Sequence, residues 1–319
     1  MNKIDIICPV FNEANTVLLF LERISLIFKE LSMEPTIIFV DDGSKDKSWN
    51  FIKQASSSIC HIRSLKLSRN FGKESAIAAG LSVSEGDAVI TIDCDLQHPP
   101  ELMKTMLTYW RDGADIVCAR KQERQSESLF DRITANSFYR LFNWITENDI
   151  KGSSDFILMD RKVVTALKSL PEKLFFYRGV VHWLGYKHVS IAFKPEERIA
   201  GKSGWSFWKK IKLAVDSLTG FSAKPLILIW FLTAFFIFFA VFVAGDALIS
   251  KFLGKSVSGF STLILVMLTT GTAILSSLCL LTIYIRQIFY EVKNRPRFFI
   301  SEDILHQRAK KYRRDEEEK

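Results

Sequence analysis

Cysteine is scarce in this chain and is not arranged as a disulfide or zinc framework. The 319 residues include 5 cysteines, an odd number, and none forms a Cys-x-x-Cys pair. The histidines His98, His182 and His188 also lack the spacing of a metal-binding motif. We therefore expect reduced thiols and a structural or supporting role for each of these three histidines.

Motifs of several protein classes are missing as well. The chain has no Gly-x-Gly-x-x-Gly dinucleotide motif and no Gly-x-Ser-x-Gly elbow for acyl transfer. Gly201-Lys202-Ser203 resembles the end of a phosphate-binding loop, but Glu196 stands where that loop requires glycine. The net charge is +8, yet no nucleic-acid-binding motif accompanies it, so we expect no nucleic-acid partner.

A secretory signal peptide is not expected either. Asn2, Lys3 and Asp5 interrupt the first residues, and the apolar stretch Ile4–Val10 is only long enough for a strand. The N-terminal region is therefore expected to stay in the cytosol. Internal repeats and low-complexity linkers are also missing from the sequence.

Two long apolar runs, by contrast, are present in the C-terminal third. Leu226–Gly245 and Thr262–Ile285 contain no charged residue. At about 1.5 Å per residue, each would span roughly 30 Å as a helix, the thickness of a bilayer's hydrocarbon core. Both runs are apolar on every face, which is not typical of a helix in a soluble core. The sequence therefore predicts a two-helix transmembrane hairpin over residues 226–286.

Basic residues gather at the outer ends of this hairpin. Lys224 and four other lysines precede it, and Arg286 with three further basic residues follows it. Cytoplasmic flanks of membrane helices are enriched in lysine and arginine. We therefore expect both termini in the cytoplasm, with the Ser250–Phe260 region outside.

The segments beside the hairpin complete the expected domain organisation. Trp205–Phe221 places apolar residues at helical spacing with lysines between them, so residues 201–225 are expected to form an amphipathic juxtamembrane helix. The alternative is a core-facing helix of the preceding domain. Residues 1–200 are expected to form a cytosolic catalytic domain, and residues 287–319 a charged cytosolic tail, nearly all charged from residue 310.

Short apolar runs alternate with helical patterns through the first 120 residues. The predicted strands are Ile4–Val10, Thr36–Val40, Ile62–Leu67, Ala88–Ile92 and Asp115–Ala119. The predicted helices between them are Asn15–Leu31, Lys47–Ser57, Glu74–Ser84 and Pro100–Trp110. Such alternation indicates right-handed crossovers and an α/β, Rossmann-like, mainly parallel sheet. Beyond Leu129 we expect a helix to Thr146, strands at Phe156–Met159 and Lys187–Phe193, and a helix from Arg161.

Polar residues follow these strands at the carboxyl ends, where such sheets bind ligands. Asp93 and Asp95 lie two residues apart after an apolar strand, so both carboxylates can reach one ion, and Gln97 adds a neutral oxygen. Oxygen ligands suit Mg²⁺ or Mn²⁺. Asp41 and Asp42 follow another strand and could contact the ribose and base of a nucleoside, whereas Asp46 is expected to cap the next helix.

These residues together resemble the family 2 glycosyltransferases of GT-A fold, in the polyprenyl-phosphate branch that includes dolichyl-phosphate mannose synthase and the bactoprenol glucosyltransferases. The resemblance covers about residues 4–225. Its motifs are Cys-Pro-Val-Phe-Asn-Glu (8–13), Val-Asp-Asp-Gly-Ser (40–44), Leu-Ser-Arg-Asn-Phe-Gly-Lys (67–73), Asp-Cys-Asp-Leu-Gln-His-Pro-Pro-Glu (93–101), Asp155-Phe156 with Met159-Asp160-Arg161, and Gly201-Lys202-Ser203.

The resemblance implies a role for several residues. Nucleotide binding is implied for Pro9, Asn12, Glu13, Asp41 and Asp42, and metal and diphosphate binding for Asp93, Asp95 and Gln97. Asp93, Asp95 and Asp155 are the catalytic candidates, and Asp155 would contact the sugar or the acceptor. Lipid-phosphate binding is implied for Arg120, Arg132, Arg198 and Lys202, although each alone reads as a surface charge. The family's lysine after Ser203 is absent here, and Lys202 is one candidate to replace it.

The resemblance also implies the reaction. It would be a single, inverting transfer from a nucleotide sugar to undecaprenyl or another polyprenyl phosphate, at the bacterial inner membrane, with UDP-glucose as the best donor candidate. Alternative donors are GDP-mannose, a UDP-N-acetylhexosamine or a UDP-aminoarabinose derivative. A non-catalytic membrane scaffold is the alternative of another class. Membrane lipids, a second copy of the chain and a flippase are the further partners considered.

Overall fold

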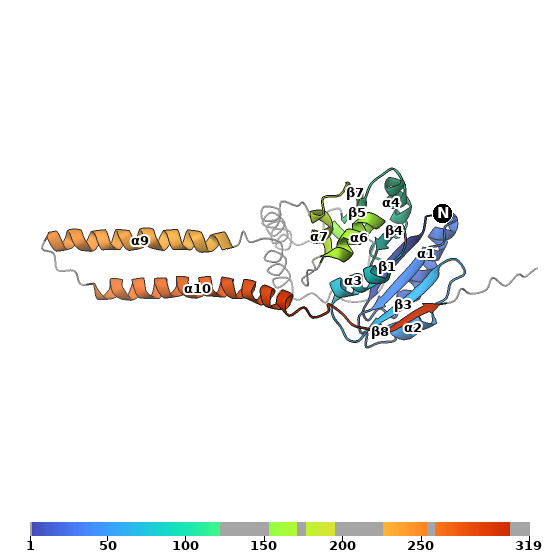
Figure 1. Ribbon diagram of the computed structural model, residues 1–319, viewed down its shortest axis with the longest axis horizontal. Coiled ribbons are helices and arrows are strands. Elements are labelled where there is room, and N and C mark those ends of the chain that lie inside the picture. The colour runs from blue at the N-terminus through green and yellow to red at the C-terminus, as the bar shows by residue number, and fades with distance from the viewer. Residues whose placement is uncertain (1, 122–152, 171–176, 195–225, 254–258, 307–319) are drawn as a thin grey trace, which may run out of the picture. The chain divides into compact units, whose positions relative to one another are not determined.

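The computed structural model describes residues 2–121, 153–170, 177–194, 226–253 and 259–306, and it divides the chain into two units. One unit holds a sheet with its helices, and the other holds two long helices (Figure 1). Two predicted helices, the one that ends at Thr146 and the amphipathic Trp205–Phe221, lie outside the described residues.

Within the described ranges the sheet has eight strands, in the order β7-β5-β6-β4-β1-β2-β3-β8. Six strands run in one direction, and β6 and β8 run antiparallel to their neighbours. The predicted mainly parallel α/β sheet is therefore confirmed. The strands are β1 (Ile4–Val10), β2 (Thr36–Asp41), β3 (His61–Leu67), β4 (Ala88–Thr91), β5 (Ile116–Lys121), β6 (Ser153–Asp160), β7 (His188–Phe193) and β8 (Ile300–His306).

Helices cover both faces of this sheet, as crossover connections require. Ile6 and Cys8 of β1 lie in one core with α1, α2 and α4, whereas Ile7 between them points to the opposite face, toward α3. A Cβ built at Gly80 of α3 would lie 2.4 Å from Ile7 Cγ2, so this close packing requires glycine. The helices in the described residues of this unit are α1 (Val17–Glu30), α2 (Ser48–Gln54), α3 (Lys73–Val83), α4 (Leu102–Arg111), α6 (Arg161–Ser169) and α7 (Tyr177–Trp183).

The C-terminal segment contributes a strand that the sequence analysis missed. β8 pairs antiparallel with β3, and Arg63 binds Asp303 through two hydrogen bonds of 2.9 and 2.7 Å. His306 Nε2 lies 2.8 Å from Ser64 Oγ. Residues 287–319, expected to be a charged tail, thus include a strand of the sheet. The sequence analysis missed β8 because its residues are mostly polar. Backbone pairing and ion pairs, rather than buried apolar side chains, hold it to the sheet.

The described part of the second unit forms α9 (Ile227–Phe252) and α10 (Phe260–Val292). The predicted apolar runs are therefore helical. Both helices contain apolar windows long enough to cross a membrane, Ile229–Asp246 and Val266–Val292, with mean hydropathies of 2.1 and 1.9. At 1.5 Å per residue, the 33 residues of α10 reach about 50 Å, so this helix is longer than a bilayer's hydrocarbon core.

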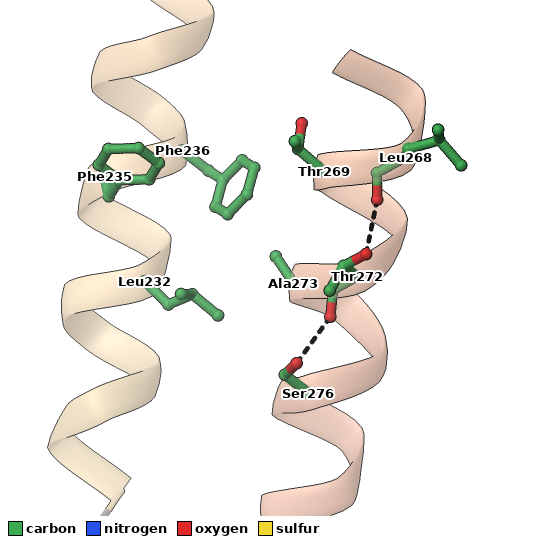
Figure 2. A pocket seen from close by; sticks show the side chains of 8 residues that line it. All are labelled: Leu232, Phe235, Phe236, Leu268, Thr269, Thr272, Ala273 and Ser276. Carbon is green, nitrogen blue, oxygen red and sulfur yellow. Dashed lines mark hydrogen bonds between the residues drawn. The ribbon is translucent and has the colours of Figure 1, made fainter. Parts of the chain in front are cut away.

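A gap of about 430 Å³ lies between the two helices (Figure 2). The hydroxyls of Thr272 and Ser276 donate hydrogen bonds to the carbonyls of Leu268 and Thr272, both at 2.8 Å. This back-bonding satisfies the hydroxyls within their own helix. Thr269 also lines the gap, and its hydroxyl donates to the carbonyl of Val266 at 3.1 Å. The other lining residues are apolar, and none of the residues that line the gap carries a charge.

Candidate functional site

The strongest acidic motif of the sequence lies at the end of β4. Asp93 and Asp95 are half-buried on either side of Cys94, which is buried in the core. Asp95 Oδ1 accepts a hydrogen bond from the backbone N–H of Gln97 at 3.1 Å. Leu96 has a φ of 57°, a left-handed conformation that residues with a Cβ rarely adopt and that clusters at functional sites. The turn thus anchors its middle in the core and keeps both carboxylates at the carboxyl edge.

β6 brings a third aspartate to the same edge. Because β6 runs antiparallel to β4 with Ile157 opposite Thr91, Asp155 lies just beyond the end of β4, level with Asp93. Lys73, the first residue of α3, joins the two carboxylates. Its Nζ lies 2.6 Å from Asp93 Oδ1 and also donates to Asp155 Oδ2. The catalytic candidates from two distant motifs therefore meet at one ammonium group.

Arg178 of α7 completes this cluster. Its Nε lies 2.5 Å from Asp155 Oδ1 and its Nη2 2.9 Å from Asp155 Oδ2, a bidentate ion pair. Burial alone would raise the pKa of Asp155, but the charges of Arg178 and Lys73 outweigh it and hold that pKa well below its ordinary value. Burial likewise opposes the charge on Lys73, yet Asp155 and Asp93 raise its pKa. At neutral pH, Asp155 is an anion and Lys73 a cation.

Glu74 supports the cluster from the next position of α3. Its Oε2 accepts a hydrogen bond from the backbone N–H of Tyr177, the first residue of α7, at 2.9 Å. Burial and the negative charge of Asp155 raise the pKa of Glu74 to about 8. At pH 7 this carboxyl is therefore mostly protonated and ties α3 to α7 without adding negative charge.

His98 lies beneath the two metal-binding candidates. Its ring packs against Phe156 and Phe193, and its Nδ1 is 3.7 Å from Asp93 Oδ2. Among the described residues, neither ring nitrogen has a hydrogen-bond partner, although both are buried. Burial lowers the pKa of His98 to about 4, so the imidazole is neutral at pH 7. A buried, unpartnered imidazole beside two carboxylates is a ready donor to a cation.

The residues around Asp93 suit a divalent metal ion. One ligand atom each from Asp93, Asp95 and His98 lies within 4.8 Å of the other two. Carboxylate oxygens are the ligands that Mg²⁺ and Mn²⁺ prefer. The positively charged ammonium of Lys73 lies 2.6 Å from Asp93 Oδ1, so this carboxylate already stabilises a cation.

A second cluster of predicted residues lies at the ends of β1 and β2. Asn12 and Glu13 donate their backbone N–H groups to the hydroxyls of Ser44 and Ser48 at 2.9 and 2.8 Å. Asn12 has a φ of 57°, which asparagine tolerates better than other residues. Pro9 is half-buried in β1, in register with β2. The structure therefore brings the expected nucleotide-binding residues of β1 to the loop that follows β2.

Asp41 and Asp42 at the end of β2 are buried and bonded to backbone N–H groups. Asp42 accepts from Phe71 at 2.7 Å and from Gly72 at 2.9 Å, one bond to each carboxylate oxygen. Asp41 accepts from the N–H of Ser44 at 3.3 Å. Burial raises the pKa of both aspartates, although these hydrogen bonds oppose the increase. Both carboxylates therefore shape the surrounding loops.

Gly43 lets these loops approach each other closely. Its φ is 69°, and a Cβ there would lie 2.6 Å from the carbonyl carbon of Arg69. Loop 69–72 leads directly into α3, where Lys73 begins the helix. Asp42 and Gly43 therefore position Lys73 on Asp93, and this links the two ends of the site.

The predicted lipid-phosphate residues are only partly described. Arg120 is half-buried near the end of β5, opposite Ser153 of β6. Arg132, Arg198 and Lys202 lie outside the described residues. Their grouping stays a prediction.

The sequence analysis gave no role to Lys73 or Arg178, and it expected only a structural or supporting role for His98. Lys73 ends a motif that carried the resemblance, but nothing in the sequence gave it a role. Arg178 belongs to none of the motifs. Its partner Asp155 is 23 positions earlier, so local spacing did not reveal the pair. His98 directly follows Gln97, and its nearness to the acidic motif was the available sign.

Comparison with known proteins agrees with these motifs. Residues 5–167 match the model of a family described as glycosyl transferase family 2. An uncharacterized glycosyltransferase of Synechocystis is 36% identical over 302 residues, covering 94% of this chain and 95% of that protein. The SfII prophage-derived bactoprenol glucosyl transferase of Shigella flexneri is 37% identical over 302 residues, covering 93% and 97%.

Solved structures are more distant. The crystal structure of mannosyl-3-phosphoglycerate synthase from Rubrobacter xylanophilus is 17% identical. The matched region covers 67% of this chain and 71% of the synthase chain, with a TM-score of 0.47. So distant a likeness carries no information on activity.

Proposed function

The chain belongs to glycosyl transferase family 2, and from this premise we propose that it transfers one sugar from a nucleotide donor to a polyprenyl phosphate. Its mainly parallel sheet is the GT-A fold that the sequence resemblance implied. The observation that carries the proposal is the meeting of Asp93, Asp95, Asp155 and Lys73 at the carboxyl edge of that sheet. Similarity to a bactoprenol glucosyl transferase over nearly the whole chain supports a lipid acceptor.

The donor is proposed to lie along the edge from β2 to β4. Its nucleoside would contact Pro9, Asn12, Glu13, Asp41 and Asp42. Mg²⁺ or Mn²⁺ would be held by Asp93 and Asp95 with Gln97, and His98 lies close enough to assist. When bound, such an ion neutralises the diphosphate leaving group. UDP-glucose is the donor we favour, because the relatives at 37% identity are named glucosyl transferases.

The acceptor requires little acid–base help. A phosphate monoester has a second pKa near 6, so it is already largely a dianion at neutral pH. Positioning and charge stabilisation then carry the in-line attack on the anomeric carbon, with inversion. Asp155 is fixed as an anion by Arg178 and Lys73, which suits it to accept a hydrogen bond from a sugar hydroxyl. Arg120, Arg132, Arg198 and Lys202 are proposed to receive the lipid phosphate.

The chain order supports a membrane hairpin with the catalytic unit on one side. β7 precedes α9 and β8 follows α10, yet both strands belong to one sheet. The chain between Phe193 and Ile300 must therefore cross a membrane an even number of times. Together with the basic flanks at Lys224 and Arg286, this supports a cytosolic catalytic unit on the inner membrane of a bacterium.

A transfer assay with the purified full-length protein tests this function. Undecaprenyl phosphate, Mn²⁺ and a panel of radiolabelled nucleotide sugars are the reagents, and label extracted with the lipid is the readout. We expect one donor, UDP-glucose first, to give lipid-linked label that requires both the acceptor and the metal. If the protein binds nucleotide but transfers sugar from none of the donors, the proposed enzymatic activity would be contradicted and a non-catalytic scaffold favoured. If transfer occurs only from another donor, the assignment of UDP-glucose as the donor would be wrong, but the transferase activity would stand.

A further inference from the structure

Three potential metal ligands meet away from the acidic motif. Cys118 lies in β5, His188 in β7 and His182 in α7, and β7 is the edge strand beside β5 (Figure 1). The register pairs Ile116 with His188, and Cys118 lies two residues further along, on the same face of the sheet. One ligand atom from each of the three lies within 4.8 Å of the other two. They share no residue with the group at Asp93.

The state of these side chains favours a ligand. His188 Nε2 is buried and has no hydrogen-bond partner among the described residues. Its ring stacks on that of His182, with centroids 4.3 Å apart and planes at 24°. Burial, helped by the charge of Arg120, lowers the pKa of His188, so the imidazole is neutral at pH 7 and free of a proton on one nitrogen. A buried acceptor or donor left unsatisfied costs free energy, which a bound ion would recover.

The donor set selects the kind of ion. One cysteine sulfur and two imidazole nitrogens are typical of Zn²⁺ and other soft first-row ions, and unsuited to Mg²⁺ or Mn²⁺. Tetrahedral Zn²⁺ needs ligand atoms about 3.3–3.6 Å apart, given bonds of about 2.3 Å to sulfur and 2.0–2.1 Å to nitrogen. The cluster would reach this by moving about 1 Å and turning the stacked rings apart. We propose that Cys118, His182 and His188 form a Zn²⁺-class site with a fourth position open.

Binding must displace the thiol proton. Burial raises the pKa of Cys118, while Arg120 opposes that rise. A thiolate on a metal is stable despite burial because the ion supplies the compensating charge. One proton leaves Cys118 as the sulfur–metal bond forms, and the two neutral imidazoles release none.

The site would steady the helix that holds Asp155. His182 lies four residues after Arg178 on α7, so both side chains are on the same face of that helix. Arg178 binds Asp155, and a metal on His182 would fasten α7 to β5 and β7 one turn away. The proposed ion therefore has a structural role, because it would hold α7, whose Arg178 binds Asp155, against β5 and β7. Its presence does not depend on which sugar or lipid the protein uses.

Cobalt binding to the full-length protein tests this site. Co²⁺ replaces Zn²⁺ in such sites, and a Co²⁺–thiolate bond gives a near-ultraviolet charge-transfer band that oxygen ligands do not give. After treatment with a chelator, the wild type and Asp95→Asn should show this band with one equivalent of Co²⁺. Cys118→Ser should lose it. Cys60→Ser, which alters a cysteine equally buried but outside the cluster, should keep it.

The histidine variants keep the test decisive if Cys118→Ser fails to fold. His188→Gln and His182→Gln retain the thiol and should each weaken Co²⁺ binding at least about tenfold, since even neighbours of metal ligands change affinity by about 10–100-fold. Zn²⁺ should displace Co²⁺ and bleach the band. Absence of a thiolate band in the wild type, its survival in Cys118→Ser, or unchanged affinity in both histidine variants would overturn the proposal.

Discussion

Asp41 and Asp42 end β2, whereas Asp93 and Asp95 follow β4, and these two strands flank β1 on either side. The first pair is almost fully buried, 0% and 3% exposed, and accepts backbone N–H groups. Asp93 of the second pair is 22% exposed, and its partner is the ammonium of Lys73.

The partners explain why two pairs that look alike in sequence differ in role. A carboxylate that accepts backbone N–H groups fixes a loop, because those donors cannot leave without unfolding it. A carboxylate that faces a side-chain cation can exchange that cation for another. Lys73 connects the two pairs, because Asp42 holds the loop that delivers it to Asp93. Asp95 also accepts one backbone N–H, from Gln97, but it is half-buried beside Asp93 and His98. The metal-binding role is therefore assigned to the half-buried pair.

Substitution at the second pair should have the largest effect. Asp95→Asn keeps the shape of the side chain and its bond to the N–H of Gln97 but removes the charge. We expect transfer to fall at least about a thousandfold, since metal stabilisation of the leaving group is worth several kcal/mol. The thermal midpoint should not change. Asp112→Asn, at an exposed acid, is the control, and equal activity in both variants would refute the distinction.

Substitution at the first pair should affect stability instead. In Asp42→Asn the amide NH₂ faces a backbone N–H, so one buried hydrogen bond is lost and two donors are opposed. We expect a loss of about 2 kcal/mol, or about 4–8 °C in the thermal midpoint. Hydrogen exchange should increase in loop 69–72. An unchanged midpoint would mean that Asp42 does not hold this loop.

The pH dependence of stability tests whether Glu74, beside the cluster of Asp155, is protonated in the folded protein. Its folded-state pKa of about 8 exceeds the ordinary 4.5, so the folded protein binds this proton more tightly than the unfolded chain. The contribution to stability is therefore complete below about pH 4.5 and is lost as pH rises through 8. Arg178 and Lys73 reduce the shift and Asp155 increases it.

Glu74→Gln should remove this dependence, because glutamine mimics the protonated acid. The measurement is the thermal midpoint from pH 5 to 8 for both proteins. The decline in the wild type should be steeper than in the variant. Parallel curves would show that Glu74 is ionised in the folded state.

The smallest effect is expected at an acid–cation pair outside the site. Asp303 binds Arg63 at the edge of the sheet, and both side chains are partly exposed. Such pairs contribute at most about 1 kcal/mol, so Asp303→Asn should lower the midpoint by no more than about 4 °C and leave transfer unchanged. A large loss of transfer would mean that β8 acts on the site.

The strands that fix the site could be predicted because their apolar runs are short and uninterrupted. β1 begins and ends at the expected residues, Ile4 and Val10, and the acidic motif follows β4 as expected. The direction of β6 was not predicted. A run such as Phe156–Met159 shows burial but does not reveal whether the strand is parallel, and the antiparallel direction is what brings Asp155 to Asp93.

Contacts between distant parts of the chain could not be predicted from spacing. His182 and His188 show no motif with Cys118. The pairing of β5 with β7 brings His188 beside Cys118, and α7 adds His182. β8 was missed because Ser301, Glu302 and Asp303 give it little of the alternating apolar pattern of a buried strand.

Counting bound Mn²⁺ by electron paramagnetic resonance tests the central claim most directly. The full-length protein is titrated with Mn²⁺ at a UDP concentration that saturates every variant, so that a weaker nucleoside contact at Asp42 does not lower the Mn²⁺ count. The variants are Asp95→Asn, Asp42→Asn and Cys118→Ser. We predict one bound Mn²⁺ in the wild type, in Asp42→Asn and in Cys118→Ser, and none at the same concentrations in Asp95→Asn. Loss of Mn²⁺ in Asp42→Asn with full binding in Asp95→Asn would contradict the assignment of the metal to the half-buried pair.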